Sequence, residues 1–165
     1  METAYPRWMY VTFSVALTLL TGALATSQLL NGMMVYSSPD AIRDGQYWFV
    51  FPIGAAAGVT LAIPAAIAAG ILVARDVEFA RTLSQALLAC LVLGVGLGAS
   101  LAFAGAGANG LGWAGIGFLL SLLGIAIGPL ALFVISYTLP ASLPVGAVLL
   151  LAVGGAYWHH RRQNR

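Results

Sequence analysis

Uncharged residues fill three long stretches of this chain, at positions 8–39, 45–74 and 82–160. The charged residues are confined to the short segments between and beyond these stretches. A charged side chain at the centre of a bilayer costs about 2.5–3.5 kcal/mol on insertion scales, so this distribution is typical of membrane-spanning helices. The pattern predicts an all-α fold, a polytopic helical bundle in which residues 1–165 form a single transmembrane domain.

The lengths of the apolar segments predict how many helices cross the membrane. A crossing needs about 20 residues at a rise of about 1.5 Å each, and five such segments fit between the polar breaks. Aromatic residues, which favour the headgroup level, lie near several segment ends, among them Trp8, Trp48 and Trp158. We therefore expect about five transmembrane helices, at residues 8–30, 48–74, 83–104, 113–137 and 144–158.

Charge does not divide the stretch from 82 to 160, so its turns are predicted from glycine and proline. The segment 105–112 contains several glycines and an Asn-Gly pair, which is a common turn sequence. The segment 138–144 contains Pro140 and Pro144, and proline does not fit the interior of a regular helix. We expect the chain to turn at both segments.

The first apolar segment has two interpretations. Arg7 precedes an apolar stretch, and the small residues at 23–25 resemble the cleavage site of a secretory signal. However, the apolar character continues to Leu30, and Tyr5, Trp8 and Tyr10 suit an interfacial anchor. We expect a retained helix, with a cleaved signal as the alternative.

Composition and charge narrow the class of protein. Hydrophobic residues make up 61% and charged residues 7% of the chain, with a mean hydropathy of +0.95, which excludes an ordinary water-soluble domain. The net charge is +2, and three of the seven basic residues, all arginines, lie in the tail at 159–165. We expect this tail to lie at lipid headgroups on the cytoplasmic side of the cell membrane, and we expect no nucleic-acid partner.

The arginines disagree with the count of five crossings. With the C-terminus inside, five crossings place Arg43 and the three tail arginines in the cytoplasm and Arg7, Arg75 and Arg81 outside. This arrangement gives almost none of the excess described by the positive-inside rule. An even number of crossings would place every arginine except Arg43 on one side. A re-entrant or in-plane segment after Gly128-Pro129 would reconcile charge with length, and we keep it as the alternative.

Small residues recur at every fourth position in several predicted helices. Such rows let helix backbones approach closely, which drives association in a bilayer because apolar side chains gain little by leaving lipid. We expect these rows to pack helices within the bundle, with a homo-oligomer or another membrane subunit as the alternative partner. The candidate packing residues are Gly54, Gly58, Ala62, Ala66, Gly70, Gly94, Gly98, Gly124 and Gly128.

Hydroxyl and amide side chains form a polar stripe along the first predicted helix. Ser14, Thr18, Thr21 and Gln28 share one side of this helix, which we expect to face the bundle. Hydrogen bonds from this stripe to other helices would each contribute about 0.6 kcal/mol. The stripe therefore predicts contacts between helices, with a path for solute as the alternative.

Two prolines fall inside predicted helices and indicate kinks. Pro64 frees the carbonyl group of Thr60, and Pro129 does the same for a residue one turn earlier. Broken helices line the binding sites of many transporters. Thr60, Pro64 and Pro129 are therefore candidate pathway residues, and purely structural kinks are the alternative.

The predicted spans lack the side chains that most catalytic sites require. Both histidines, His159 and His160, lie in the basic tail, Cys90 is the only cysteine, and no acidic residue falls inside a span. Haem, zinc, disulfide-redox and serine-hydrolase chemistry all need groups that are missing from the predicted spans. The GxGxxG match at 105–110 follows an apolar helix rather than a strand, so we interpret it as a turn. We expect no cofactor, no metal and no enzymatic activity.

Three functional hypotheses remain from different classes, and an intramembrane enzyme is the one with the least support. The first is a non-catalytic accessory or scaffold protein that acts through helix contacts in the lipid bilayer. The alternative is a passive permease or channel-like protein for a small neutral solute.

The short charged link at 75–81, where Asp76 or Glu78 could pair with Arg81, is expected to be a solvated turn.

Overall fold

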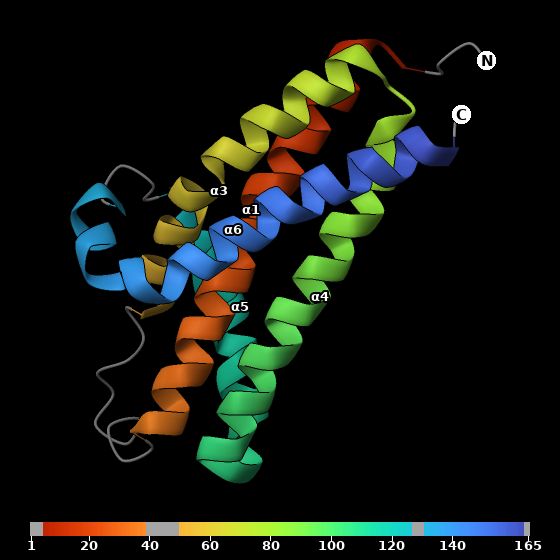
Figure 1. The fold of residues 1–165 in the computed structure, drawn as a ribbon. Helices are drawn as coiled ribbons and strands as arrows, with labels where there is room; N and C mark the ends of the chain where they lie inside the picture. Colours follow the sequence, from red (N-terminus) through yellow and green to blue (C-terminus); the bar gives the residue numbers. More distant parts are fainter. Residues whose placement is uncertain (1–4, 39–49, 127–130, 164–165) are drawn as a thin grey trace.

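The computed structural model describes residues 5–38, 50–126 and 131–163 of the chain (Figure 1). These residues form five α-helices and one short 3-10 turn, with no strand among them, which confirms the predicted all-α class. The elements are α1 (Arg7–Ser37), α3 (Val50–Arg75), α4 (Phe79–Ala106), η1 (Gly107–Asn109), α5 (Gly110–Ala126) and α6 (Ala131–Gln163).

Four helical segments among the described residues are long and apolar enough to cross a membrane. They are Arg7–Ser37, Val50–Arg75, Phe79–Asn109 and Leu143–Gln163. The fifth helix, α5, is apolar but short: its 17 residues extend about 26 Å, which is less than the hydrocarbon core of about 30 Å. The predicted fourth segment, 113–137, falls on α5 and on the start of α6, and its residues 127–130 lie outside the described residues.

The turn predicted at residues 105–112 is confirmed. Helix α4 ends at Ala106, and Gly107 follows with a φ of 59°, the left-handed conformation that glycine adopts without steric cost. A 3-10 turn over Gly107–Asn109 then leads directly into α5. Helices α4 and α5 consequently meet in a tight hairpin.

The turn predicted at residues 138–144 is wrong. Helix α6 is continuous from Ala131 to Gln163 and includes both Pro140 and Pro144. Proline removes one backbone hydrogen bond and bends a helix, but neighbouring groups can compensate for the lost bond in membrane helices. Figure 1 shows α6 changing direction along its length instead of ending.

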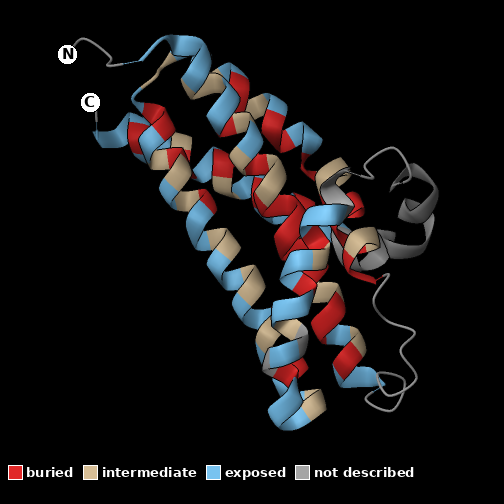
Figure 2. Ribbon diagram, turned by 180° about the vertical axis from the view of Figure 1, so that it is seen from behind, coloured by how far each residue is buried: buried red, intermediate tan, exposed pale blue. Residues whose placement is uncertain are grey.

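Helix α1 forms the axis of the bundle. It contacts α3, α4, α5 and α6, and all residues from 21 to 28 are buried. Helices α3 and α4 pack on opposite sides of α1 and have few contacts with each other. Figure 2 shows the resulting burial along α1 and on the faces of the other helices that point toward it.

Both ends of the described chain lie at the same end of the bundle (Figure 1). Here the start of α1, the α3–α4 link and the end of α6 come together, and Phe79 contacts Tyr157 with ring centroids 5.6 Å apart. All charged residues that the structure describes belong to these segments, which we call the charged end: Arg7, Arg75, Asp76, Glu78, Arg81, Arg161 and Arg162. Five full crossings would place the two termini at opposite ends, so this arrangement agrees with the alternative of an even number of crossings.

Helices α5 and α6 explain why the segment count and the position of the termini disagree. Helix α5 starts at the opposite end, beside the end of α4, and Ser121 in its later part contacts Ser27 of α1. The later part of α6, from Leu149 onward, packs at the charged end. Of these two helices, only α6 contains a described segment long enough to cross a membrane, Leu143–Gln163, which makes the number of candidate crossings even, in agreement with the arginine distribution.

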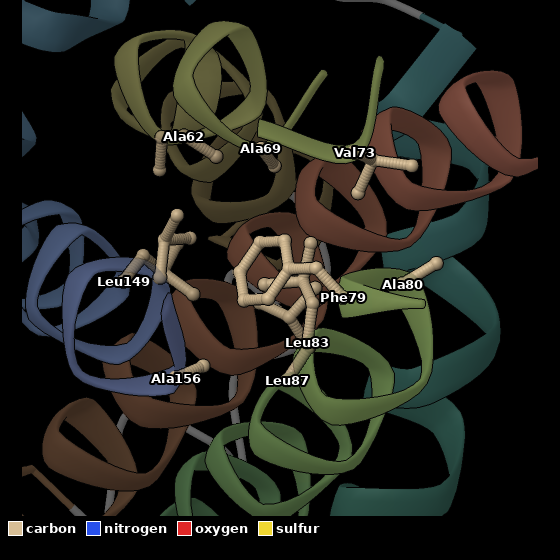
Figure 3. Close-up of a cluster of buried hydrophobic side chains, with 11 residues drawn as sticks. Ala62, Ala69, Val73, Phe79, Ala80, Leu83, Leu87, Leu149 and Ala156 are labelled. Atoms are coloured by element: carbon tan, nitrogen blue, oxygen red, sulfur yellow. The ribbon is translucent and has the colours of Figure 1, made fainter. Parts of the chain in front are cut away.

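A hydrophobic cluster fills the bundle near the charged end (Figure 3). Phe79, Leu83 and Leu87 of α4 meet Leu149 of α6 and the alanines of α3, all of them fully or almost fully buried. Because α3 contributes mainly alanine, α6 can approach it closely. This cluster fixes the position of the last part of α6 against α3 and α4.

Candidate functional site

The buried face of α1 carries most of the polar side chains in the interior. Ser14, Thr18, Thr21 and Gln28, the predicted stripe, are all at most 2% exposed, so the stripe faces the bundle. The expected bonds between helices are not made by its threonines, because Thr18 Oγ1 donates to Ser14 O at 2.7 Å and Thr21 Oγ1 to Leu17 O at 2.8 Å. The two threonine hydroxyl groups therefore donate their hydrogen bonds to backbone carbonyl groups within α1.

A second group of polar residues lies deeper along α1, and we call it the polar centre. It consists of Thr26, Ser27, Gln28 and Asn31 of α1 with Ser121 of α5. All five side chains are at most 1% exposed. The polar centre lies where α3 begins and α5 reaches its last turns, so α1, α3 and α5 converge on it.

Ser27 connects three helices through its hydroxyl group. Its Oγ donates to Phe51 O of α3 at 2.8 Å and lies 2.5 Å from Ser121 Oγ of α5. Ser121 Oγ in turn donates to Gly117 O at 2.6 Å. Each hydroxyl group has one proton, so the two protons serve three contacts and only two of these contacts are made at a time. The hydroxyl pair can therefore change its donors without moving a heavy atom.

The amide groups of the polar centre have no such partners within the described part of the chain. Neither Nε2 nor Oε1 of Gln28 makes a hydrogen bond there, and the same holds for Asn31 Nδ2 and Thr26 Oγ1. A buried polar group that is left unpaired costs about 1–3 kcal/mol. The polar centre thus retains unused donors and an acceptor, all uncharged, in the middle of an apolar bundle.

The predicted packing residues of α3 and α4 lie against α1. Gly54 faces the backbone of Ser27, Gly58 faces Gly22, and Ala62 approaches Gly22 as well. On the other side of α1, Gly94 faces Ala25 and Gly98 faces the backbone of Gln28. The matching small residues of α1 are Gly22, Ala25 and Gly32, which were not predicted because they do not recur at every fourth position.

The other candidate packing residues and the candidate pathway residues either do not belong to the polar centre or lie outside the described residues. Ala66 and Gly70 are buried at the contact between α3 and α1, with Gly70 opposite Val15. Gly124 lies near the end of α5, while Gly128 and Pro129 lie outside the described residues. The structure does not bring Thr60 and Pro64 to the polar centre: Thr60 Oγ1 donates to Ala56 O within α3 at 3.1 Å, and Pro64 is exposed on the outer face.

A different polar pair ties the ends of three helices at the charged end. His160 Nε2 of α6 lies 2.7 Å from Asp76 Oδ2 in the α3–α4 link, so Asp76 pairs with the tail rather than with Arg81. The His160 side chain is 9% exposed and that of Asp76 is 42% exposed. The Phe79 ring lies beside His160, and Arg162 stacks on Trp158 at 3.6 Å from the ring centroid. This cluster positions the end of α6.

These two polar regions differ in what they can do chemically. The polar centre offers hydroxyl and amide groups, which bind neutral polar groups by hydrogen bonds but do not supply a general base or a charged nucleophile. In the described parts of the chain, no three histidine, cysteine, aspartate or glutamate side chains lie close enough together to hold a metal ion. None of the family models, curated proteins or solved structures compared with this chain matches it.

Proposed function

We propose that this protein is a non-catalytic, multi-pass membrane subunit that acts through helix–helix contacts, and that the outer face of α4 makes the contact. The observation behind this proposal is a second row of small residues. One row of α4, including Gly94 and Gly98, packs on α1, while Gly96, Ser100 and Ala104 recur at every fourth position on the exposed face. Rows of this kind allow a partner helix to approach closely.

The surroundings of this row support the same conclusion. The most apolar part of α4 is only 17% buried, compared with 44% for those of α1 and α3. Gly96 has open space where a side chain would be, and Ser100 bonds only to Gly96 O within α4, at 2.7 Å. Exposed leucines flank the row and would fill the grooves of a partner helix, among them Leu93 and Leu97.

The contact is tested by extracting the protein in a mild detergent and measuring the mass of the complex. The wild type should be recovered with a stoichiometric partner or as a defined homo-oligomer, and G96L should release a monomer. The control is G115L on α5, which also adds a side chain in open space and should leave the complex intact. A wild-type protein that extracts as a monomer without a partner would overturn the proposal.

A second candidate function is passive permeation of a small neutral solute. The buried amides of Gln28 and Asn31 favour it, because they lack partners among the described residues and lie along the polar stripe of α1. In liposomes, Q28L should reduce the flux of a solute such as glycerol, while S100A on the outer face should not. Wild-type liposomes as impermeable as protein-free ones would exclude this function.

We further propose that the charged end faces the cytoplasm of the cell. Five arginines lie there among the described residues, against two acidic residues, Asp76 and Glu78. The positive-inside rule counts basic residues close to the ends of membrane helices, and this end satisfies it. The basic tail and the start of α1 would then both lie on the cytoplasmic side.

A further inference from the structure

An apolar groove runs along the outside of the bundle between α1 and α3. Ile63, Ile67 and Ile71 of α3 form one wall, and Val15 and Leu19 of α1 form the other. Its volume is about 330 Å³, and its lining is almost entirely apolar. The small residues Ala66 and Gly70 of α3 leave the space between the two walls.

The register of the two helices places an arginine at the end of each wall. Arg7 belongs to the same row of every fourth residue as Val15 and Leu19, and Arg75 belongs to the row of the three isoleucines. A side chain at Gly70 would meet Val15 and Val11, which sets α1 against α3 at this level. From there, Arg7 lies about 6 Å beyond Val11 and Arg75 about 7.5 Å beyond Gly70 in the same direction.

Both arginines are exposed, and among the described residues the acidic side chain next to Arg75 in the sequence is engaged elsewhere. Asp76, which follows Arg75, is held by His160 of α6 at 2.7 Å. Glu78 is exposed on the α3–α4 link, three residues beyond Arg75. The mouth of the groove therefore carries two positive charges at the level where α1 and α3 leave the membrane.

We propose that this groove binds one anionic phospholipid, with an acyl chain along the isoleucine wall and the phosphate group between Arg7 and Arg75. Charge favours this occupant over a second copy of the chain. Two copies related by a two-fold axis along the membrane normal would bring four arginines together at the same level, which is repulsive. A lipid phosphate instead places a negative charge between the two arginines, and guanidinium groups bind phosphate oxygens well.

The headgroup contact is tested by native mass spectrometry of the full chain in a mild detergent. The probes are phosphatidylglycerol and phosphatidylcholine with identical acyl chains. One phosphatidylglycerol molecule should bind more tightly than phosphatidylcholine. The double variant R7Q/R75Q should lose this preference, with affinity reduced about fivefold per arginine and about 25-fold in total. The control R161Q/R162Q removes the same charge from the end of α6 and should keep the preference.

The acyl-chain contact has its own matched pair of variants. I67A removes a wall residue that is 58% exposed, and I116A removes the same type of residue on α5, where it is 50% exposed. I67A should weaken the binding of both lipids, whereas I116A should have no effect on either.

Three results would overturn the proposal. They are equal affinity of the wild type for the two lipids, an equal loss of preference in R161Q/R162Q, and a dimer that forms unchanged in R7Q/R75Q and excludes lipid. Because these measurements concern α1 and α3 rather than the outer face of α4, they are independent of the partner-helix proposal.

Discussion

At Gly98 the backbones of α4 and α1 approach so closely that a methyl group has no room, because it would overlap the carbonyl oxygen of Gln28. Backbone atoms cannot move aside as a flexible side chain can. We expect G98A to destabilise the bundle by about 1–3 kcal/mol, as overpacking does in protein cores. The midpoint of thermal unfolding in detergent measures this change.

Gly96, two residues earlier in the same helix, is the matched control. A side chain there would meet nothing within 4 Å, so G96A should leave stability unchanged or raise it slightly, since alanine is the better helix former. Equal effects of the two substitutions would contradict the packing described for α4 against α1.

Ser27 offers a second test at the scale of a residue. S27A removes the bonds to Phe51 O and to Ser121 Oγ and should cost about 1 kcal/mol, while S100A on the exposed face should cost less. In the double variant S27A/S121A, the two effects should fail to add by about 0.6 kcal/mol. Strict additivity would mean that the two hydroxyl groups do not interact.

The packing glycines were predictable from the sequence, whereas the contact of Ser27 was not. Gly54, Gly58, Gly94 and Gly98 could be identified because small residues at a regular spacing predict close packing in lipid. Ser27 could not, because its partner Ser121 is 94 residues away and only the register of α5 against α1 brings the two together.

At the scale of an element, the two turns predicted between 82 and 160 had opposite outcomes. Gly107 requires a left-handed backbone conformation, so glycine marks the end of α4 directly. Pro140 and Pro144 lie within α6 because a proline bends a helix as readily as it ends one. Which of these occurs depends on neighbouring backbone groups, and the local sequence does not contain that information.

At the same scale, the contact between Asp76 and His160 holds the end of α6 against the α3–α4 link. D76N keeps an acceptor for the Glu78 N–H, which lies 3.1 Å from Asp76 Oδ1, but weakens the contact with His160. Because the pair is partly exposed, we expect a loss of less than about 1 kcal/mol in global stability.

Local opening should respond more strongly than global stability. In D76N, backbone amides near the end of α6 should exchange hydrogen faster, and E78Q on the same exposed link should not have this effect. Unchanged exchange in D76N would show that the hydrophobic cluster alone fixes α6.

At the scale of the whole molecule, the arginines predicted the placement of the chain ends better than segment lengths did. Length suggested five crossings because α5 and the first part of α6 together supply enough apolar residues for one more helix. The positions of the arginines indicate the side on which each connecting segment lies, and five described arginines lie at one end of the bundle. A short helix such as α5 can only be distinguished from a full crossing once its packing is known.

This topology predicts the sides from which introduced cysteines can be labelled. In a Cys90→Ala background, V77C and Q163C should react only with reagent supplied from the cytoplasmic side, and A108C only with reagent supplied from outside. All three positions lie in segments at the ends of the bundle. Reaction of V77C and Q163C from opposite sides would contradict the shared position of the α3–α4 link and the C-terminal end of α6.

The central position of α1 has a consequence for how the protein is made. Helix α1 is synthesised before α4, yet Gln28 packs directly against Gly98 of α4, which follows it by 70 residues (98 minus 28). At about 5–20 residues per second, α1 waits about 4–14 s for that partner. During this interval lipid cannot hydrogen-bond its two amide side chains. Insertion machinery that retains α1 beside protein or headgroups until α4 arrives would therefore favour correct assembly.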